Sequence, residues 1–236
     1  DRDHRWDRAV PVPFLRGEGR MATSGTINAV GDHDWFRMTL AANTLYVLAT
    51  SQGGGMGLLI LDANGAFMDG SGDTYGNGQL AFMPAVAGTY YVDVGDWYSV
   101  TGAYGLSLTV VADDYRNNVT TTGILAVGGM ASGTINAVGD HDWFRMSLTA
   151  NTLYTLAAKT GDLVDEDKLL MIYDASGILV DQMDASGAQL AFMPAITGTY
   201  YVDLADLSVA TGAYSLSLSS VADDYRNNPT TSGILS

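Results

Sequence analysis

"SGTINAVGDHDWFRMTLAANTLYVLA" at residues 24–49 returns as "SGTINAVGDHDWFRMSLTANTLYTLA" at residues 132–157. Two further stretches return in the same order. "QLAFMPAVAGTYYVDV" at 79–94 becomes "QLAFMPAITGTYYVDL" at 189–204, and "VADDYRNNVTTTGIL" at 111–125 becomes "VADDYRNNPTTSGIL" at 221–235. Self-similarity at a nearly fixed spacing is the signature of duplicated structural units. The sequence therefore predicts two homologous domains in tandem.

Each repeat is built from short runs typical of β-strands. "TLYVLAT", "LLILDANG" and "GTYYVDVG" are β-branched or aromatic runs separated by Gly, Asn, Asp and Ser. No stretch keeps a helical apolar period over three turns. Repeats of about 100 residues with this pattern are typical of antiparallel sandwiches. We expect an all-β fold of two tandem antiparallel β-sandwich domains, jelly-roll-like in topology.

The repeat boundaries divide the chain into four parts. We expect a divergent N-terminal leader or strand at 1–20, one sandwich at 21–112, a second at 113–222, and at 223–236 an orphan strand that opens a further repeat. In the leader, the residues at the spacings of Asp113, Asn117, Ile124 and Leu125 are Asp3, Asp7, Phe14 and Leu15. The leader is therefore a candidate to supply its own ligands and strand. Pro11 and Pro13 restrict a leader strand to a sheet edge.

Composition limits the partners. The net charge is −15, from 26 acidic and 11 basic side chains. This excess disfavours nucleic acid and anionic membranes, whose binding depends on Lys and Arg. No apolar run reaches the roughly 20 residues that span a bilayer, so membrane insertion is not expected. Cysteine is absent, which excludes disulfides, zinc–thiolate sites and thiol nucleophiles. Abundant carboxylates suit Ca²⁺, a hard cation with oxygen ligands.

The repeated "GDHDWF" at 31–36 and 139–144 is the main candidate site. In a strand, Asp32 and Asp34 share one face with Phe36, while His33 lies on the other. Two carboxylates on one face can converge, and a bound cation removes their repulsion. The alternative is that these Asp residues only cap a turn by accepting backbone N–H bonds. Asp140 and Asp142 repeat the pattern.

The histidines and aromatic residues of this motif do not indicate catalysis. His33 and His141 occupy equivalent positions, and no Ser or Cys nucleophile stands at a recognisable elbow. We therefore expect no enzyme. The paired aromatics, at Trp35, Phe36, Trp143 and Phe144, are expected in the core.

The order "DDYRNN-x-TT-x-GIL-x-VGG-x-A-x-GTI-x-x-x-GD-x-DWF", followed by "GTYYVDV" and "TGAYSLSL", resembles the bacterial pre-peptidase C-terminal domain family. The clostridial collagen-binding domains are relatives of that family. The resemblance implies secreted or cell-surface β-sandwich modules without catalysis, several of which bind Ca²⁺ where a leading linker meets an Asp-containing turn. Residues 1–20 do not match.

Carried over to this sequence, the resemblance implies linker ligands at Asp113, Asp114 and Asn117 and turn ligands at Asp140 and Asp142. The same positions recur around the other copies. They are Asp32 and Asp34 in the first repeat, and Asp223, Asp224 and Asn227 in the C-terminal segment.

Three non-repeated segments are secondary candidates. The loop 69–78 places Asp69, Ser71 and Asp73 at alternate positions but lacks the closing Glu of a calcium loop, and the loop 162–168 is acidic. For both, a solvated turn is the preferred interpretation. Trp97 and Tyr98 could stack on a sugar or peptide, or simply pack under a neighbouring domain.

Two functions remain open. The first is a calcium-stabilised extracellular structural module that polymerises head to tail when residues 223–236 add to a sheet edge of a neighbouring copy. The second is a module that binds collagen, another matrix protein or a polysaccharide for a larger secreted peptidase or adhesin.

Overall fold

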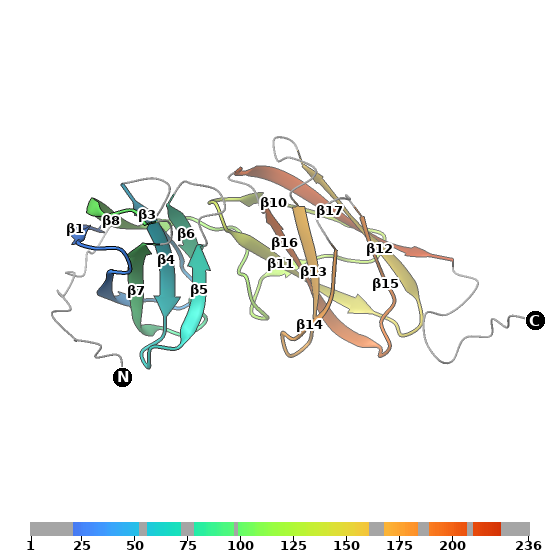
Figure 1. Ribbon diagram of the computed structural model, residues 1–236. Coiled ribbons are helices and arrows are strands. Elements are labelled where there is room, and N and C mark those ends of the chain that lie inside the picture. The colour runs from blue at the N-terminus through green and yellow to red at the C-terminus, as the bar shows by residue number, and fades with distance from the viewer. Residues whose placement is uncertain are drawn as a thin grey trace, which may run out of the picture. The chain divides into compact units, whose positions relative to one another are not determined.

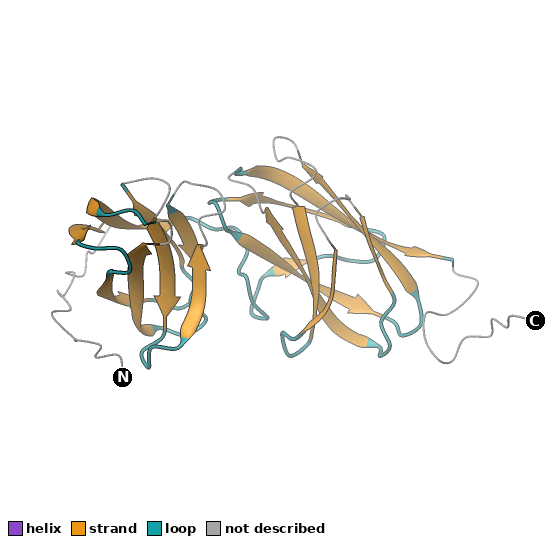
Figure 2. Cartoon of the chain, viewed as in Figure 1, coloured by secondary structure: helices purple, strands orange, loops and turns teal. Residues whose placement is uncertain are grey.

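The computed structural model describes residues 21–51, 56–71, 78–96, 99–160, 168–183, 189–206 and 210–222. These residues contain strands, turns and loops and no helix (Figure 2). The chain divides into two compact units, Asp1–Ala112 and Asp113–Ser236. Among the described residues, no helical segment is long and apolar enough to span a bilayer.

In the part of unit 1 that the structure describes, eight strands form a sandwich, drawn in Figure 1. Its strands are β1 (Met21–Ile27), β2 (His33–Leu40), β3 (Leu45–Thr50), β4 (Met56–Leu61), β5 (Phe67–Ser71), β6 (Gln79–Phe82), β7 (Gly88–Asp96) and β8 (Gly102–Val111). One sheet has the order β1-β8-β3-β6 and the other β2-β7-β4-β5, and every pair is antiparallel. This is the strand order of a jelly roll. The predicted fold class is confirmed.

Unit 2 repeats this topology and adds one strand. Its strands are β9 (Gly123–Ile124), β10 (Met130–Ile135), β11 (His141–Leu148), β12 (Leu153–Thr160), β13 (Lys168–Asp174), β14 (Leu179–Met183), β15 (Gln189–Phe192), β16 (Gly198–Asp206) and β17 (Gly212–Val221). The sheets run β10-β17-β12-β15 and β14-β13-β16-β11-β9. The short β9 pairs with β11 in parallel, beyond the jelly-roll order.

The core of each unit lies between its two sheets. Strands with a period of two place every second side chain inward. β11 shows this alternation, since Phe144, Met146 and Leu148 are buried and the residues between them are exposed. β2 repeats it with Phe36, Met38 and Leu40. Burial of these apolar side chains supplies the main folding force.

The motif tryptophans do not follow the prediction uniformly. Phe36 and Phe144 lie in the two core clusters. Trp143 is buried on the opposite face of its sheet, where it packs against Tyr173 and Tyr201. For Trp35 the prediction of a core position is wrong, since 37% of the residue is exposed. In unit 2 the segment that leads into β9 is bonded to the backbone of β11, since the Thr121 hydroxyl donates to the Trp143 carbonyl.

Candidate metal centre

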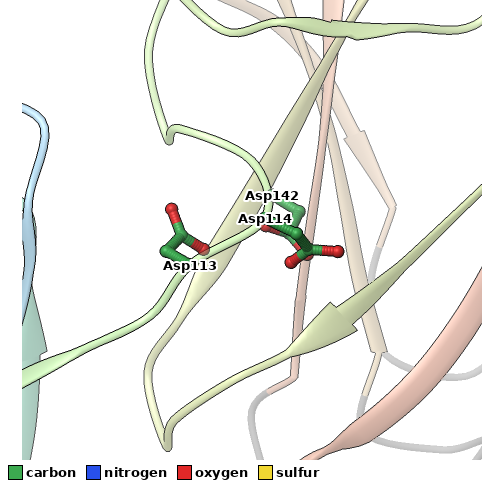
Figure 3. A group of neighbouring side chains, drawn as sticks. All are labelled: Asp113, Asp114 and Asp142. Carbon is green, nitrogen blue, oxygen red and sulfur yellow. The ribbon is translucent and has the colours of Figure 1, made fainter.

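Three carboxylates from two segments converge in unit 2 (Figure 3). Asp113 and Asp114 lie on the segment that precedes β9, and Asp142 is the second residue of β11. One oxygen of each carboxylate lies within 4.8 Å of the other two. The segment that precedes β9, called the linker below, is thus brought together with strand β11 at Asp113, Asp114 and Asp142, which were predicted as ligands.

Asp142 is the buried member of this cluster. Asp142 is fully buried, with 0% of its surface exposed. The Tyr214 hydroxyl donates to Oδ2 at 2.6 Å, whereas Oδ1 has no hydrogen-bond partner among the described residues. A buried acceptor left unpaired costs about 1–3 kcal/mol, and more when it is charged. Burial, together with the charges of Asp140, Asp114 and Asp113, raises the pKa of Asp142 to about 9 against the lowering effect of the Tyr214 hydrogen bond.

The two linker carboxylates are less buried. Asp114 is exposed, and its Oδ2 accepts the Thr134 backbone N–H at 3.0 Å. Burial raises the pKa of Asp114, while backbone hydrogen bonds lower it. Burial raises the pKa of Asp113 to about 7, with further contributions from the charges of Asp140 and Asp114. Three ionised carboxylates at this spacing require a compensating positive charge.

Asp140 stands beside the cluster and is not one of the three converging residues. It is 1% exposed, its Oδ2 accepts the Asn136 N–H at 2.7 Å, and its Oδ1 accepts the His141 N–H at 2.9 Å. These bonds are the turn-capping pattern. Burial raises the pKa of Asp140 to about 6. Asn117, the remaining predicted ligand of this group, is partly buried in the linker.

Unit 1 contains the equivalent strand residues. The Tyr104 hydroxyl donates to Asp34 Oδ2 at 2.7 Å, and Asp32 caps its turn by accepting the backbone N–H groups of Asn28 and His33. Asp32 and Asp34 are both partly exposed. The other predicted ligands, Asp223, Asp224 and Asn227, lie outside the described residues, as do residues 72–77, 97–98 and 161–167 of the secondary candidates.

The predicted alternation of the motif is confirmed in β11. Asp142 and Phe144 share a face, because Tyr214 bonds to the first and packs edge-on against the second. His141 and Trp143 lie on the other face. There His141 Nδ1 lies 2.9 Å from Asp203 Oδ2, and Trp143 packs against Tyr201.

Sequence reasoning missed the tyrosine that holds the site. Tyr214 lies opposite Gly133 in the β10–β17 register, and Tyr104 lies opposite Gly25 in the β1–β8 register. A Cβ atom on Gly133 would lie 2.6 Å from Tyr214 Cζ and 3.0 Å from Asp114 Oδ2. The glycine thus leaves room for the ring and the linker carboxylate. The signal was the recurrence of "SGTI" and "TGAY" in both repeats.

The histidines were correctly separated from the carboxylate cluster, but their partners were missed. His33 Nδ1 lies 3.0 Å from Asp93 Oδ1, as His141 lies near Asp203. Burial raises the pKa of Asp93, and the His33 hydrogen bond lowers it. Because each imidazole is paired with a carboxylate on a central strand, these pairs link neighbouring strands of the outer sheet face.

The donor set fits Ca²⁺. The converging groups offer only oxygen atoms, the ligands of hard cations, and the His141 ring is directed to Asp203. The unpaired Oδ1 of Asp142 supplies a buried acceptor in the same cluster. Soft or borderline metals prefer thiolate or imidazole ligands, which these three residues do not provide.

No protein-family model matches the chain, and no curated protein does. Similar solved structures include PliG of Aeromonas hydrophila, a periplasmic inhibitor of g-type lysozyme, with 14% identity, 43% of this chain and 94% of that chain covered, and a TM-score of 0.37. The CUB1-EGF-CUB2 domains of human MASP-1/3 match with 6% identity, coverages of 84% and 99%, and a TM-score of 0.27.

A third similar structure is Clostridium perfringens ZmpB, its M60 catalytic domain with two CBM51 domains. It matches with 8% identity, coverages of 82% and 34%, and a TM-score of 0.24. At these values none of the three carries an inference about ligand or activity.

Proposed function

We propose that the chain is a secreted, non-catalytic structural module of two β-sandwiches, stabilised by Ca²⁺, that assembles head to tail through residues 223–236. The observation that carries the proposal is the buried Asp142, whose Oδ1 has no hydrogen-bond partner among the described residues and whose carboxylate lies in a cluster with those of Asp113 and Asp114. The motif order that resembles the pre-peptidase C-terminal domain supports the same conclusion.

Calcium would join the start of unit 2 to strand β11. Asp113 and Asp114 begin unit 2, and the chain that follows them reaches β9, where Leu125 enters the core. A cation shared with Asp142 on β11 fixes the start of this segment to the body of the sandwich. An ion that binds only the folded form stabilises it by about 2.7 kcal/mol at 100 times its dissociation constant.

A non-catalytic role agrees with the residues of the site. The carboxylates converge on one another, and the histidines pair with Asp93 and Asp203 on the opposite sheet face. The groups present therefore support metal binding better than acyl or proton transfer.

The rival proposal, a module that binds collagen or polysaccharide, depends on Trp97 and Tyr98. Both lie outside the described residues, so the structure gives that proposal no geometric support.

Isothermal titration with Ca²⁺ tests the proposed function. The unmodified chain should bind Ca²⁺, and Asp142→Asn should lose the unit 2 site because the amide keeps the shape but removes the charge. Asp181→Asn is the matched control, since Asp181 lies on β14 at the opposite edge of the same sheet. Equal heats for Asp142→Asn and the unmodified chain would overturn the proposal.

A further inference from the structure

Unit 2 shows how a short segment completes this sandwich. β9 adds to the edge of β11 in parallel, with Gly123 opposite Phe144 and Ile124 opposite Arg145. The Leu125 N–H donates to the Arg145 carbonyl at 3.0 Å, and the Thr121 hydroxyl donates to the Trp143 carbonyl at 2.7 Å. The segment is therefore held by backbone and side-chain bonds along one strand edge.

Side-chain packing also holds the segment that contains β9 against unit 2. Leu125 is 1% exposed and belongs to the unit 2 core, and the Tyr115 ring lies 4.5 Å from the Phe144 ring. Gly123 permits this approach, because a Cβ there would lie 2.6 Å from the Trp143 carbonyl oxygen. The docked segment thus requires glycine at the first strand position and a leucine two residues later.

In unit 1 the corresponding edge is open among the described residues. β2 is the terminal strand of its four-stranded sheet, with β7 as its partner. A partly open apolar groove lies beside it, lined in part by Met21, Phe36, Met38 and Leu108. Phe36 is 8% exposed, whereas its counterpart Phe144 is 0% exposed.

The groove occupies the place that Leu125 fills in unit 2. Its lining residues Phe36, Met38 and Leu108 correspond to Phe144, Met146 and Leu218, which share the unit 2 core with Leu125. Unit 1 also keeps the residue types that receive the segment in unit 2. These are Ser24, Thr26, Asp34, Trp35, Arg37, Tyr91 and Tyr104.

One segment of the chain matches this edge in sequence. Residues 223–235 repeat residues 113–125 with two differences, Pro229 for Val119 and Ser232 for Thr122. Gly233 and Leu235 stand at the positions of Gly123 and Leu125. Val119 contributes its carbonyl to the Tyr201 hydroxyl, and proline retains that carbonyl.

The N-terminal leader has a leucine, Leu15, at the position of Leu125, but the residues before it match less well. At the spacing set by Asp3 and Asp113, Pro13 takes the place of Gly123 and Pro11 that of Thr121. Proline has no N–H to replace the bond from Gly123 to Thr121 Oγ1, and it has no hydroxyl to replace that of Thr121.

We propose that the open edge of β2 binds residues 231–235 of a second copy of the chain as a parallel fifth strand. Gly233 lies opposite Phe36, Ile234 lies opposite Arg37, and Leu235 fills the apolar groove. This inference rests on the proposed head-to-tail assembly and names the surface and register that carry it. The docked segment also brings Asp223 and Asp224 to Asp34, as Asp113 and Asp114 lie near Asp142.

The occupant belongs to a second copy because the segment leads forward along the chain. Residues 113–125 leave β8 of unit 1 and dock on unit 2, the next unit. Residues 223–235 leave β17 at the same spacing, and the β11 edge of unit 2 already carries β9. The β2 strand of another copy offers an edge of this type, since among the described residues its partner is β7 alone. A contact between different surfaces of identical chains propagates into a filament.

Disulfide trapping tests the register, because the chain has no cysteine of its own. Paired strands lie about 4.8 Å apart, within the range that a disulfide spans. Full-length Arg37→Cys and full-length Ile234→Cys are mixed in Ca²⁺ and oxidised. We expect a covalent dimer that neither variant forms alone. The double variant should give a ladder of multimers. Ile124→Cys with Arg145→Cys is the positive control, since these residues are paired within one chain.

The outcomes separate the inference from the proposed function. No mixed dimer, with full oxidation of the control pair, would overturn the inference, as would a double variant that crosslinks only within single chains. Sedimentation of the unmodified chain measures assembly independently of the crosslink. Assembly without the crosslink overturns this register alone, whereas a chain that stays monomeric in Ca²⁺ overturns head-to-tail assembly as well. Calcium binding is read separately by titration.

Discussion

The Tyr214 hydroxyl and the Asp142 carboxylate are joined by a 2.6 Å hydrogen bond across 72 residues of sequence. The bond occupies Oδ2, whereas Oδ1 has no hydrogen-bond partner among the described residues, and the Asp142 carboxylate belongs to the cluster with Asp113 and Asp114. Burial and the neighbouring Asp142 raise the pKa of Tyr214, so the hydroxyl remains a donor at neutral pH. One carboxylate is thus oriented by the sandwich and presented to the linker.

Removing that hydroxyl should weaken unit 2. Tyr214→Phe leaves Asp142 Oδ2 without its donor, at a cost of about 1–3 kcal/mol in the free energy of unfolding. Calorimetry in chelator should show a lower melting temperature for unit 2. Tyr104→Phe is the matched control, and its effect should be smaller because Asp34 is partly exposed. Equal losses in the two variants would contradict this account of Asp142.

Without metal, the stability of unit 2 should fall as the pH rises. Burial raises the pKa of Asp140 to about 6, of Asp113 to about 7 and of Asp142 to about 9. The folded form then binds more protons than the unfolded chain above about pH 4, so its stability decreases with rising pH. Melting in chelator at pH 5 and pH 8 checks this.

Saturating Ca²⁺ should remove most of this pH dependence, because the ion binds the ionised carboxylates. Calcium affinity should accordingly increase between pH 5 and pH 8. A melting temperature in chelator that rises over the same interval would contradict the assigned pKa directions.

Substitution of Gly133 should disturb the site through its geometry. In Gly133→Ala the new methyl group meets the Tyr214 ring and Asp114 Oδ2. Overpacking of this kind costs about 1–3 kcal/mol, and it should also weaken calcium binding in titration. Gly198→Ala is the control, since a Cβ at Gly198 has no neighbour within 4 Å. If the two variants bind Ca²⁺ equally, Gly133 has no role in shaping the site.

Calcium removal should loosen the linker before the body of unit 2. The amide of Leu125, bonded to the Arg145 carbonyl, should exchange hydrogen faster in chelator because its segment loses one attachment. Amides of Val202 on the central strand β16 serve as the reference. If hydrogen exchange became faster at both amides by the same factor, or at neither, the ion would not hold this segment to unit 2.

Local sequence patterns predicted much of the fold and part of the site. The alternation of Asp142, Phe144 and Met146 follows from the pleat of a strand, and the repeats required two copies of one sandwich. The first two features depend on neighbours in sequence or on direct self-comparison. Asp113 and Asp114 were named only because the motif order resembles the pre-peptidase C-terminal domain family.

The remaining features depend on register between distant strands. The bond from Tyr214 to Asp142 and the pairing of His141 with Asp203 require strand alignments that no local pattern specifies. The exposure of Trp35 was missed for a related reason, since the burial of Trp143 in the identical motif comes with ring contacts to Tyr173 and Tyr201 on other strands. For Asp32 and Asp140 the sequence left metal binding and turn capping as alternatives, and the structure shows their capping bonds to backbone N–H groups.

The most direct test of the calcium centre is a high-resolution crystal structure of the full chain grown in Ca²⁺. The account predicts an ion bound by oxygens of Asp113, Asp114 and Asp142 at about 2.3–2.6 Å, with Asp142 Oδ1 among its ligands. Well-ordered density in which these three carboxylates surround no ion would contradict it.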